Sequence, residues 1–496
     1  MGKLKSLAKD TAIYGVSSIL GRFLNWCLVP LYTITFAQAE YGVVTFVYSV
    51  VAVVLIVLTY GMETGFFRFA NHDRWKDPME VYSTSLFSLA FTSTVFVLLV
   101  AAFIEPVSRW MECAGHESYV MMMAVCVALD AFLALPFSYL RYRKRPVRFA
   151  AIRLVNIGVN IGLNLFFILL CPWLMKAAPG SVDWFYRPDF GIGYIFLANL
   201  IASVVNFVMM IPELRGFKWR FNTRLLGEML RYSAPLLIFG IAGIMNQTID
   251  KILYPTLAAG SGDAMSGLGI YGANYKIAIV MVMFIQAFRF AYEPFIFARD
   301  KDEGENRVRV YADAMKYFVL FSLLIFLGVM FYLDIIKYFI SPRYFSGLKV
   351  VPVVMLAELF FGIFFNLSVW YKITDRTIWG AWFSIFGLSI TLALNCLLVP
   401  RIGYMGCAWA AFFSYGAMML ASYFVGRARY PIPYPVGRIL SYCAIAAVLY
   451  VIGMYCLTSS EIVNGILRFF LLAGFVLLIA RREGIPLPQR HKSVSK

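Results

Sequence analysis

Fourteen apolar stretches run through the chain, and they limit its possible folds more strongly than any other feature. Nearly all of them reach the roughly 20 residues that a helix needs to cross about 30 Å of hydrocarbon. They cover approximately residues 11–35, 41–67, 82–104, 118–140, 149–170, 191–212, 232–257, 268–297, 311–333, 350–371, 378–399, 404–426, 437–457 and 463–480. A composition of 61% hydrophobic and 14% charged residues excludes a soluble domain. The sequence therefore predicts an all-α, polytopic membrane protein with about fourteen transmembrane helices.

The loops between these stretches alternate between rich and poor in lysine and arginine. If the N-terminus is cytoplasmic, the loops on its side hold 30 of the 44 basic residues, and the opposite loops hold 7. Basic residues near helix ends are retained on the cytoplasmic side, so both termini are predicted to be cytoplasmic. The net charge of +17 then indicates contact with anionic membrane lipids and excludes nucleic acid as a partner.

Short identities recur between the two halves of the chain. They pair Tyr41-Gly42 with Tyr271-Gly272, Asn164 with Asn395, and Ile192-Gly193-Tyr194 with Ile402-Gly403-Tyr404. This order predicts two six-helix lobes, residues 1–215 and 216–430, followed by two extra helices and a tail in residues 431–496. An even number of helices makes the repeats parallel, and transporters of this kind bind substrate between the halves.

Three polar residues share one face of the first predicted helix: Ser18, Arg22 and Asn25. Arg22 lies about 11 residues, roughly 16 Å, from the start of that helix. An arginine at this depth costs about 2.5–3.5 kcal/mol on insertion scales, so it is predicted to face a cavity or an anion. A structural ion pair with a neighbouring helix is the alternative.

Polar residues of the second half form a similar set. Lys276 is a candidate for substrate contact or for an ion pair with Asp250, because both are predicted near the outer side. Gln286 and Arg289 belong to one stripe that ends at Glu293. The stripe either lines a cavity or contains a simple pair of Arg289 with Glu293, four residues apart.

Four intramembrane acids are candidates for ion coupling, because a desolvated carboxylate can become neutral by taking a proton. They are Glu63, Asp130, Asp250 and Glu358. Arg153 and Arg468 are predicted near helix ends, where their side chains can reach the interface. No catalytic constellation, metal-ligand spacing or nucleotide-binding loop occurs, so we expect no enzyme activity, no metal and no cofactor.

Short motifs in the first twelve predicted helices resemble one known family. The motifs are Leu20–Asn25, Val29–Tyr32, Glu40–Gly42, Gly61–Thr64, Phe67–Phe69, Asp250–Lys251, Tyr271–Gly272, Tyr275–Lys276, Gln286–Arg289 and Glu293–Phe295. The sequence is similar to the Wzx-type polysaccharide flippases of the multidrug/oligosaccharidyl-lipid/polysaccharide exporter superfamily. In this resemblance, Arg22 matches the cavity arginine of the family in type and place.

The resemblance implies a flippase of the bacterial cytoplasmic (inner) membrane. Its substrate would be an undecaprenyl-pyrophosphate-linked oligosaccharide for O-antigen, lipopolysaccharide or another surface polysaccharide, moved to the periplasmic leaflet by alternating access. Membrane lipids and polysaccharide assembly proteins would be its partners. Two alternatives remain: a cation-coupled multidrug exporter of the same fold, which calls for an acidic cavity, and a membrane glycosyltransferase or polymerase, which usually needs a large outer loop.

Overall fold

The computed structural model confirms an all-helical membrane protein. It describes residues 15, 17, 19–71, 74–75, 77–217, 221–260, 262–298, 305–374, 376–455 and 460–484. Thirteen helices in this part of the chain are long and apolar enough to span a membrane, and it contains no strand. The first predicted stretch lies partly outside the described residues. Ser18 also lies outside them.

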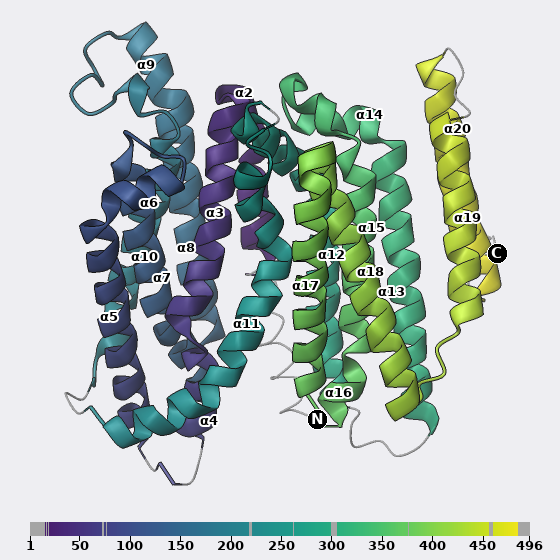
Figure 1. Ribbon diagram of the computed structural model, residues 1–496, viewed down its shortest axis with the longest axis horizontal. Coiled ribbons are helices and arrows are strands. Elements are labelled where there is room, and N and C mark those ends of the chain that lie inside the picture. The colour runs from purple at the N-terminus through teal and green to yellow at the C-terminus, as the bar shows by residue number, and fades with distance from the viewer. Residues whose placement is uncertain are drawn as a thin grey trace, which may run out of the picture.

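The first half of the chain forms a bundle on the left of Figure 1. Its helices are α2 (Val29–Thr35), α3 (Gln38–Thr59), α4 (Met62–Ala70), α5 (Pro78–Ala102), α6 (Ile104–Trp110), α7 (Glu117–Tyr142), α8 (Pro146–Leu165), α9 (Cys171–Ala177) and α10 (Gly193–Met210). The helix before α2 turns at Cys27 and Leu28. Pro30 then lies in the first turn of α2, where a missing backbone N–H costs nothing.

The second half forms a bundle on the right of Figure 1. Its helices are α11 (Thr223–Leu257), α12 (Ala264–Ala298), α13 (Glu305–Phe331), α14 (Leu333–Ile336), α15 (Val350–Leu367), α16 (Val369–Ile373), α17 (Ile378–Ile402), α18 (Tyr404–Arg429), α19 (Val436–Tyr455) and α20 (Glu461–Arg482). We call the two bundles the N-lobe and the C-lobe. Helices α19 and α20 stand at the outer edge of the C-lobe, in yellow.

Helix α11 contacts both lobes and runs obliquely between them in Figure 1. Its first turns pack on the N-lobe: Asn222 caps the helix at Leu225 and donates to Glu80 of α5 at 2.9 Å. Arg68 of α4 stacks over Tyr232, 4.0 Å from the ring centroid. The later turns of α11 pack on α17 of the C-lobe. The lobe boundary at residue 216 remains a prediction.

The two lobes meet closely near the N-terminal ends of α3 and α12. A methyl group on Gly42 would overlap the carbonyl oxygen of Met265, and one on Gly269 would overlap that of Gln38. Only glycines permit this approach of two backbones. The lobes are therefore in backbone contact near the starts of α3 and α12, at the outer end of the interface in the predicted orientation.

Arg468 of α20 makes its contacts with the C-lobe, and its predicted reach to the interface stays a prediction. Its guanidinium is buried and donates to the carbonyl oxygens of Gly453 and Phe331, at 2.9 and 3.1 Å. It also pairs with Asp334 at 2.7 Å. These contacts with two carbonyl oxygens and a counter-ion hold α20 against the C-lobe.

Candidate functional site

A cavity of about 460 Å³ lies between the two lobes. The N-lobe side consists of Arg22, Asn25, Leu28, Val29, Tyr32, Tyr41, Val44, Thr45, Tyr48, Ser49, Asn160 and Asn199. The C-lobe side consists of Gln247, Thr248, Lys251, Gly272, Tyr275, Lys276, Ile279, Val282 and Gln286. This is the place where parallel-repeat transporters bind their substrates.

The charges on the described cavity wall are all positive. Arg22, Lys251 and Lys276 line the cavity, and no carboxylate does so among the residues that the structure describes. Within that part of the chain, Arg22 and Lys276 make no side-chain hydrogen bond or ion pair. Since unpaired charges are costly in a membrane, this cavity is suited to an anion.

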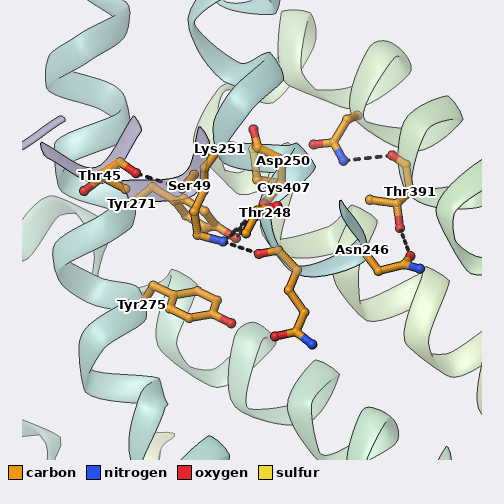
Figure 2. A network of polar contacts seen from close by, with 12 residues as sticks. Thr45, Ser49, Asn246, Thr248, Asp250, Lys251, Tyr271, Tyr275, Thr391 and Cys407 are labelled. Carbon is orange, nitrogen blue, oxygen red and sulfur yellow. Dashed lines mark hydrogen bonds and ion pairs between the residues drawn. The ribbon is translucent and has the colours of Figure 1, made fainter. Parts of the chain in front are cut away.

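Lys251 is the exception, because its ammonium already has a counter-ion. Figure 2 shows it beside Asp250, with Nζ 3.1 Å from Oδ1 of that residue. Nζ also donates to the carbonyl oxygen of Gln247 at 2.9 Å. It lies 4.3 Å from the ring centroid of Tyr275, within cation–π range. Lys251 thus connects a buried ion pair to the cavity wall.

The suggested ion pair of Asp250 with Lys276 is wrong. Asp250 is buried and instead pairs with Lys251, and it accepts a hydrogen bond from Tyr271 at 2.7 Å. Adjacent residues of one helix usually point apart, so the sequence spacing gave no reason to expect this pair. Its formation leaves Lys276 free to face the cavity.

The other three candidate acids also lie away from the cavity wall. Glu358 accepts a hydrogen bond from Tyr275 at 2.7 Å and is 5% exposed. Asp130 accepts one from Ser203 at 2.9 Å, inside the N-lobe. Glu63 forms a half-exposed ion pair with Arg141 at 2.8 Å. Their role in ion coupling remains a prediction.

Of the predicted substrate-binding residues, the structure brings Arg22, Asn25, Lys276 and Gln286 together around one cavity. Arg289 is not among the lining residues. Its guanidinium instead stacks over Phe365 of α15, 3.8 Å from the ring centroid. The alternative, an ion pair of Arg289 with Glu293, falls on a side chain outside the described residues.

Sequence reasoning missed the neutral polar residues of the N-lobe wall: Asn160, Asn199 and Tyr48. Asn160 donates to the side-chain carbonyl of Asn25 at 3.2 Å. Asn199 of α10 donates to the hydroxyl of Tyr48 on α3. A usable signal was the spacing of asparagines along α8, since Asn156, Asn160 and Asn164 recur every four residues and share one helix face.

The sequence and the fold together place the chain in a known class. Residues 7–299 match the family model for polysaccharide biosynthesis proteins. This match covers more than half of the chain, and the protein therefore belongs to the polysaccharide biosynthesis protein family. No curated protein matches the sequence significantly.

Solved structures of transporters share the fold. The lipid II flippase MurJ, in an inward closed conformation, is 13% identical over 95% of this chain and 99% of its own, with a TM-score of 0.73. A multidrug resistance MATE family transporter of the MOP superfamily, in an inward-facing conformation, is 12% identical over 85% and 98%, with a TM-score of 0.66. A multidrug resistance MATE family transporter in an outward-facing conformation is 14% identical over 85% of this chain and 95% of its own, with a TM-score of 0.56. The chain thus has the fold of this transporter superfamily.

Proposed function

We propose that the protein flips an undecaprenyl-pyrophosphate-linked oligosaccharide from the cytoplasmic to the periplasmic leaflet by alternating access. The observation that carries this proposal is the wall of Arg22, Lys251 and Lys276, with no carboxylate among the described lining residues. A pyrophosphate is the one charged part of such a substrate, and it lies where sugar meets lipid. Fixed cations inside a cavity lower the cost of moving that charge out of water.

The close contact between the lobes at the predicted outer end supports the proposed direction of transport. The backbones of α3 and α12 approach each other there at Gly42 and Gly269. A substrate made in the cytoplasm would enter before this contact opens. Membership of the polysaccharide biosynthesis protein family supports a lipid-linked saccharide as cargo. Assembly proteins as partners are part of the proposal.

A multidrug exporter of the same fold is not favoured by the cavity. Cationic drugs require carboxylates within reach, but Asp250 and Glu358 are occupied by partners inside the C-lobe. Arg22 and Lys276, which have no counter-ion among the described residues, would repel such drugs. A glycosyltransferase is not favoured either, since the described cavity wall carries no acid for general base chemistry.

Substitution of Arg22 tests the proposal. Arg22→Ala should lower export at least about tenfold, because a hydrogen bond to a charged group contributes about 1.5–3 kcal/mol. Arg22→Lys should recover part of it, since the charge stays but the two-pronged guanidinium is lost. The measurement is surface polysaccharide per amount of membrane-inserted protein. Arg109→Ala is the control, because Arg109 is exposed and pairs only with Glu105. Full export by Arg22→Ala would refute the proposal.

Cysteine labelling tests the proposed orientation. Ser181 follows α9 and Pro431 precedes α19, and both are exposed. In a variant without native cysteines, Ser181→Cys should react with a membrane-impermeant reagent from outside, whereas Pro431→Cys should react only after lysis. The reverse labelling pattern would show the opposite orientation in the membrane and would contradict the proposed direction of transport.

A further inference from the structure

We infer that the two walls of the cavity bind different parts of one substrate. The C-lobe wall takes the pyrophosphate, and the N-lobe wall binds the first sugar through Asn25, Tyr48, Asn160 and Asn199. This inference rests on the proposed function and adds the orientation of the substrate to it. It also assigns a sugar subsite to neutral residues.

The cations are unequally divided between the walls, although Asp250 balances one of them. Lys251, which pairs with Asp250, and Lys276 belong to α11 and α12 of the C-lobe, whereas Arg22 is the one charged residue among the described N-lobe lining. A phosphate group offers only acceptor oxygens, so donors and cations attract it and carbonyl oxygens repel it. The pyrophosphate should therefore lie against the C-lobe and within reach of Arg22.

The N-lobe wall offers donors and acceptors side by side. Asn199 uses its amide N–H groups on the hydroxyl of Tyr48 and on the carbonyl oxygen of Ile195. Within the described residues, this leaves the amide carbonyl of Asn199 and the hydroxyl hydrogen of Tyr48 without partners. A sugar hydroxyl or acetamido group can both donate and accept, so it matches this pair whereas a phosphate does not.

A second set of hydrogen bonds holds the N-lobe amides in place. Asn164 donates to the side-chain carbonyl of Asn160 at 3.1 Å, and Tyr32 donates to that of Asn164 at 2.9 Å. Asn160 in turn donates to Asn25 at 3.2 Å. Asn164 is fully buried, so the ladder is anchored inside the lobe. At the cavity end of this ladder, Asn160 holds the side-chain carbonyl of Asn25 and so fixes the orientation of the Asn25 amide. A fixed orientation of this kind favours selective binding.

Tyrosine rings extend the same wall. Tyr32, Tyr41 and Tyr48 all line the cavity from the N-lobe. An aromatic ring offers an apolar face with a polar tip, and this combination suits the mixed C–H and O–H surface of a sugar. Among the described lining residues, the C-lobe contributes one tyrosine, Tyr275.

Binding of two matched probes tests the inference. Purified protein in nanodiscs is titrated with farnesyl pyrophosphate and with farnesyl pyrophosphate that carries N-acetylglucosamine or galactose. At least one sugar-bearing probe should bind about tenfold more tightly than the bare probe, as two added hydrogen bonds would give. Tyr48→Phe and Asn199→Leu should reduce this ratio to about threefold or less.

Asn156→Leu is the matched control. Asn156 lies one turn before Asn160 on α8, donates to the carbonyl oxygen of Ala202 at 2.9 Å and does not line the cavity. It should leave the ratio of the two affinities unchanged, whatever it does to stability. The inference is overturned if both sugar-bearing probes bind like the bare probe, or if the Tyr48 and Asn199 variants keep the full ratio. Failure of wild-type protein to bind any of the probes would instead refute the proposed function.

Discussion

The two lobes present different polar groups around the cavity. Around the cavity, the N-lobe uses neutral amides, as in the ladder of Asn25, Asn160 and Asn164. The C-lobe uses charges, as in the pair of Asp250 with Lys251 and the carboxylate of Glu358. Neutral ladders cost little to desolvate and stay in place, whereas a buried ion pair is stable only while both partners are present. The N-lobe side of the site thus depends on uncharged hydrogen bonds, and the C-lobe side depends on charges.

This difference has a consequence for transport. An anion that enters the cavity meets Lys251, whose present counter-ion is Asp250. The proposed substrate and Asp250 would then compete for one ammonium group, so binding would change the charge balance inside the C-lobe. Nothing comparable happens in the amide ladder, because its hydrogen bonds carry no net charge.

The largest expected effect comes from breaking the C-lobe pair. Lys251→Met leaves Asp250 buried without a counter-ion and should destabilise the protein by about 3–5 kcal/mol. The double variant Asp250→Asn with Lys251→Met should recover most of this loss, since no unpaired charge remains. In the N-lobe, Asn164→Leu should cost only about 1–3 kcal/mol, the penalty for unsatisfied neutral partners. Thermal unfolding in detergent measures all three. A larger loss in Asn164→Leu than in Lys251→Met would contradict the comparison.

A second prediction concerns the contact between the lobes. Gly269→Ala places a methyl group against the carbonyl oxygen of Gln38 and should force α3 and α12 apart. Overpacking of this kind costs about 1–3 kcal/mol, which shifts a two-state equilibrium roughly 5- to 150-fold. A cysteine at Ser49 on the cavity wall should then be labelled faster from outside. Gly243→Ala is the control, because no other atoms lie near Gly243. Equal labelling in both variants would show that this contact does not close the outer side.

The sequence predicted the fold better than the site. Hydropathy and loop charge depend on composition over about twenty residues, so the helices were evident from the chain alone. The pairing of Lys251 with Asp250 was not evident from the chain, because it depends on the rotation of α11 about its own axis relative to α12. Arg22 could be chosen from its depth in a helix. Asn199 could not, since its role comes from the neighbouring Tyr48 on another helix.

A third prediction asks which lobe carries ion coupling. Asp130 of the N-lobe accepts a hydrogen bond from neutral Ser203 at 2.9 Å. Glu358 of the C-lobe accepts one from Tyr275, whose ring lies 4.3 Å from the ammonium of Lys251, so Glu358 belongs to a cluster that already contains a cation. We therefore expect Asp130→Asn to abolish the dependence of export on the proton gradient, and Glu358→Gln to keep it. Transport into inverted vesicles with and without an imposed pH gradient measures this. An unchanged dependence in Asp130→Asn would assign Asp130 to helix packing.

The smallest expected effect compares the starts of α3 and α12, the two helices that cross between the lobes. Helix α3 is capped by Glu40, whose carboxylate accepts from the backbone N–H of Ala37 at 2.8 Å. At α12, Asp263 accepts from the side chain of Ser266 and from its backbone N–H, at 3.1 Å for the latter. These hydrogen bonds hold the pKa of the Asp263 carboxyl below its usual range.

Asp263→Ala should therefore cost about 0.5–2 kcal/mol, at the low end because Asp263 is exposed. A depressed pKa stabilises the fold above the unfolded-state pKa, and this contribution is lost as the pH falls through the folded-state value. The difference in melting temperature between wild type and Asp263→Ala should thus be present at pH 7 and shrink below about pH 4. Asp263→Asn should retain most of the stability at both values, since an amide oxygen also caps a helix. A difference that stays constant with pH would mean that the carboxylate charge does not contribute to the cap.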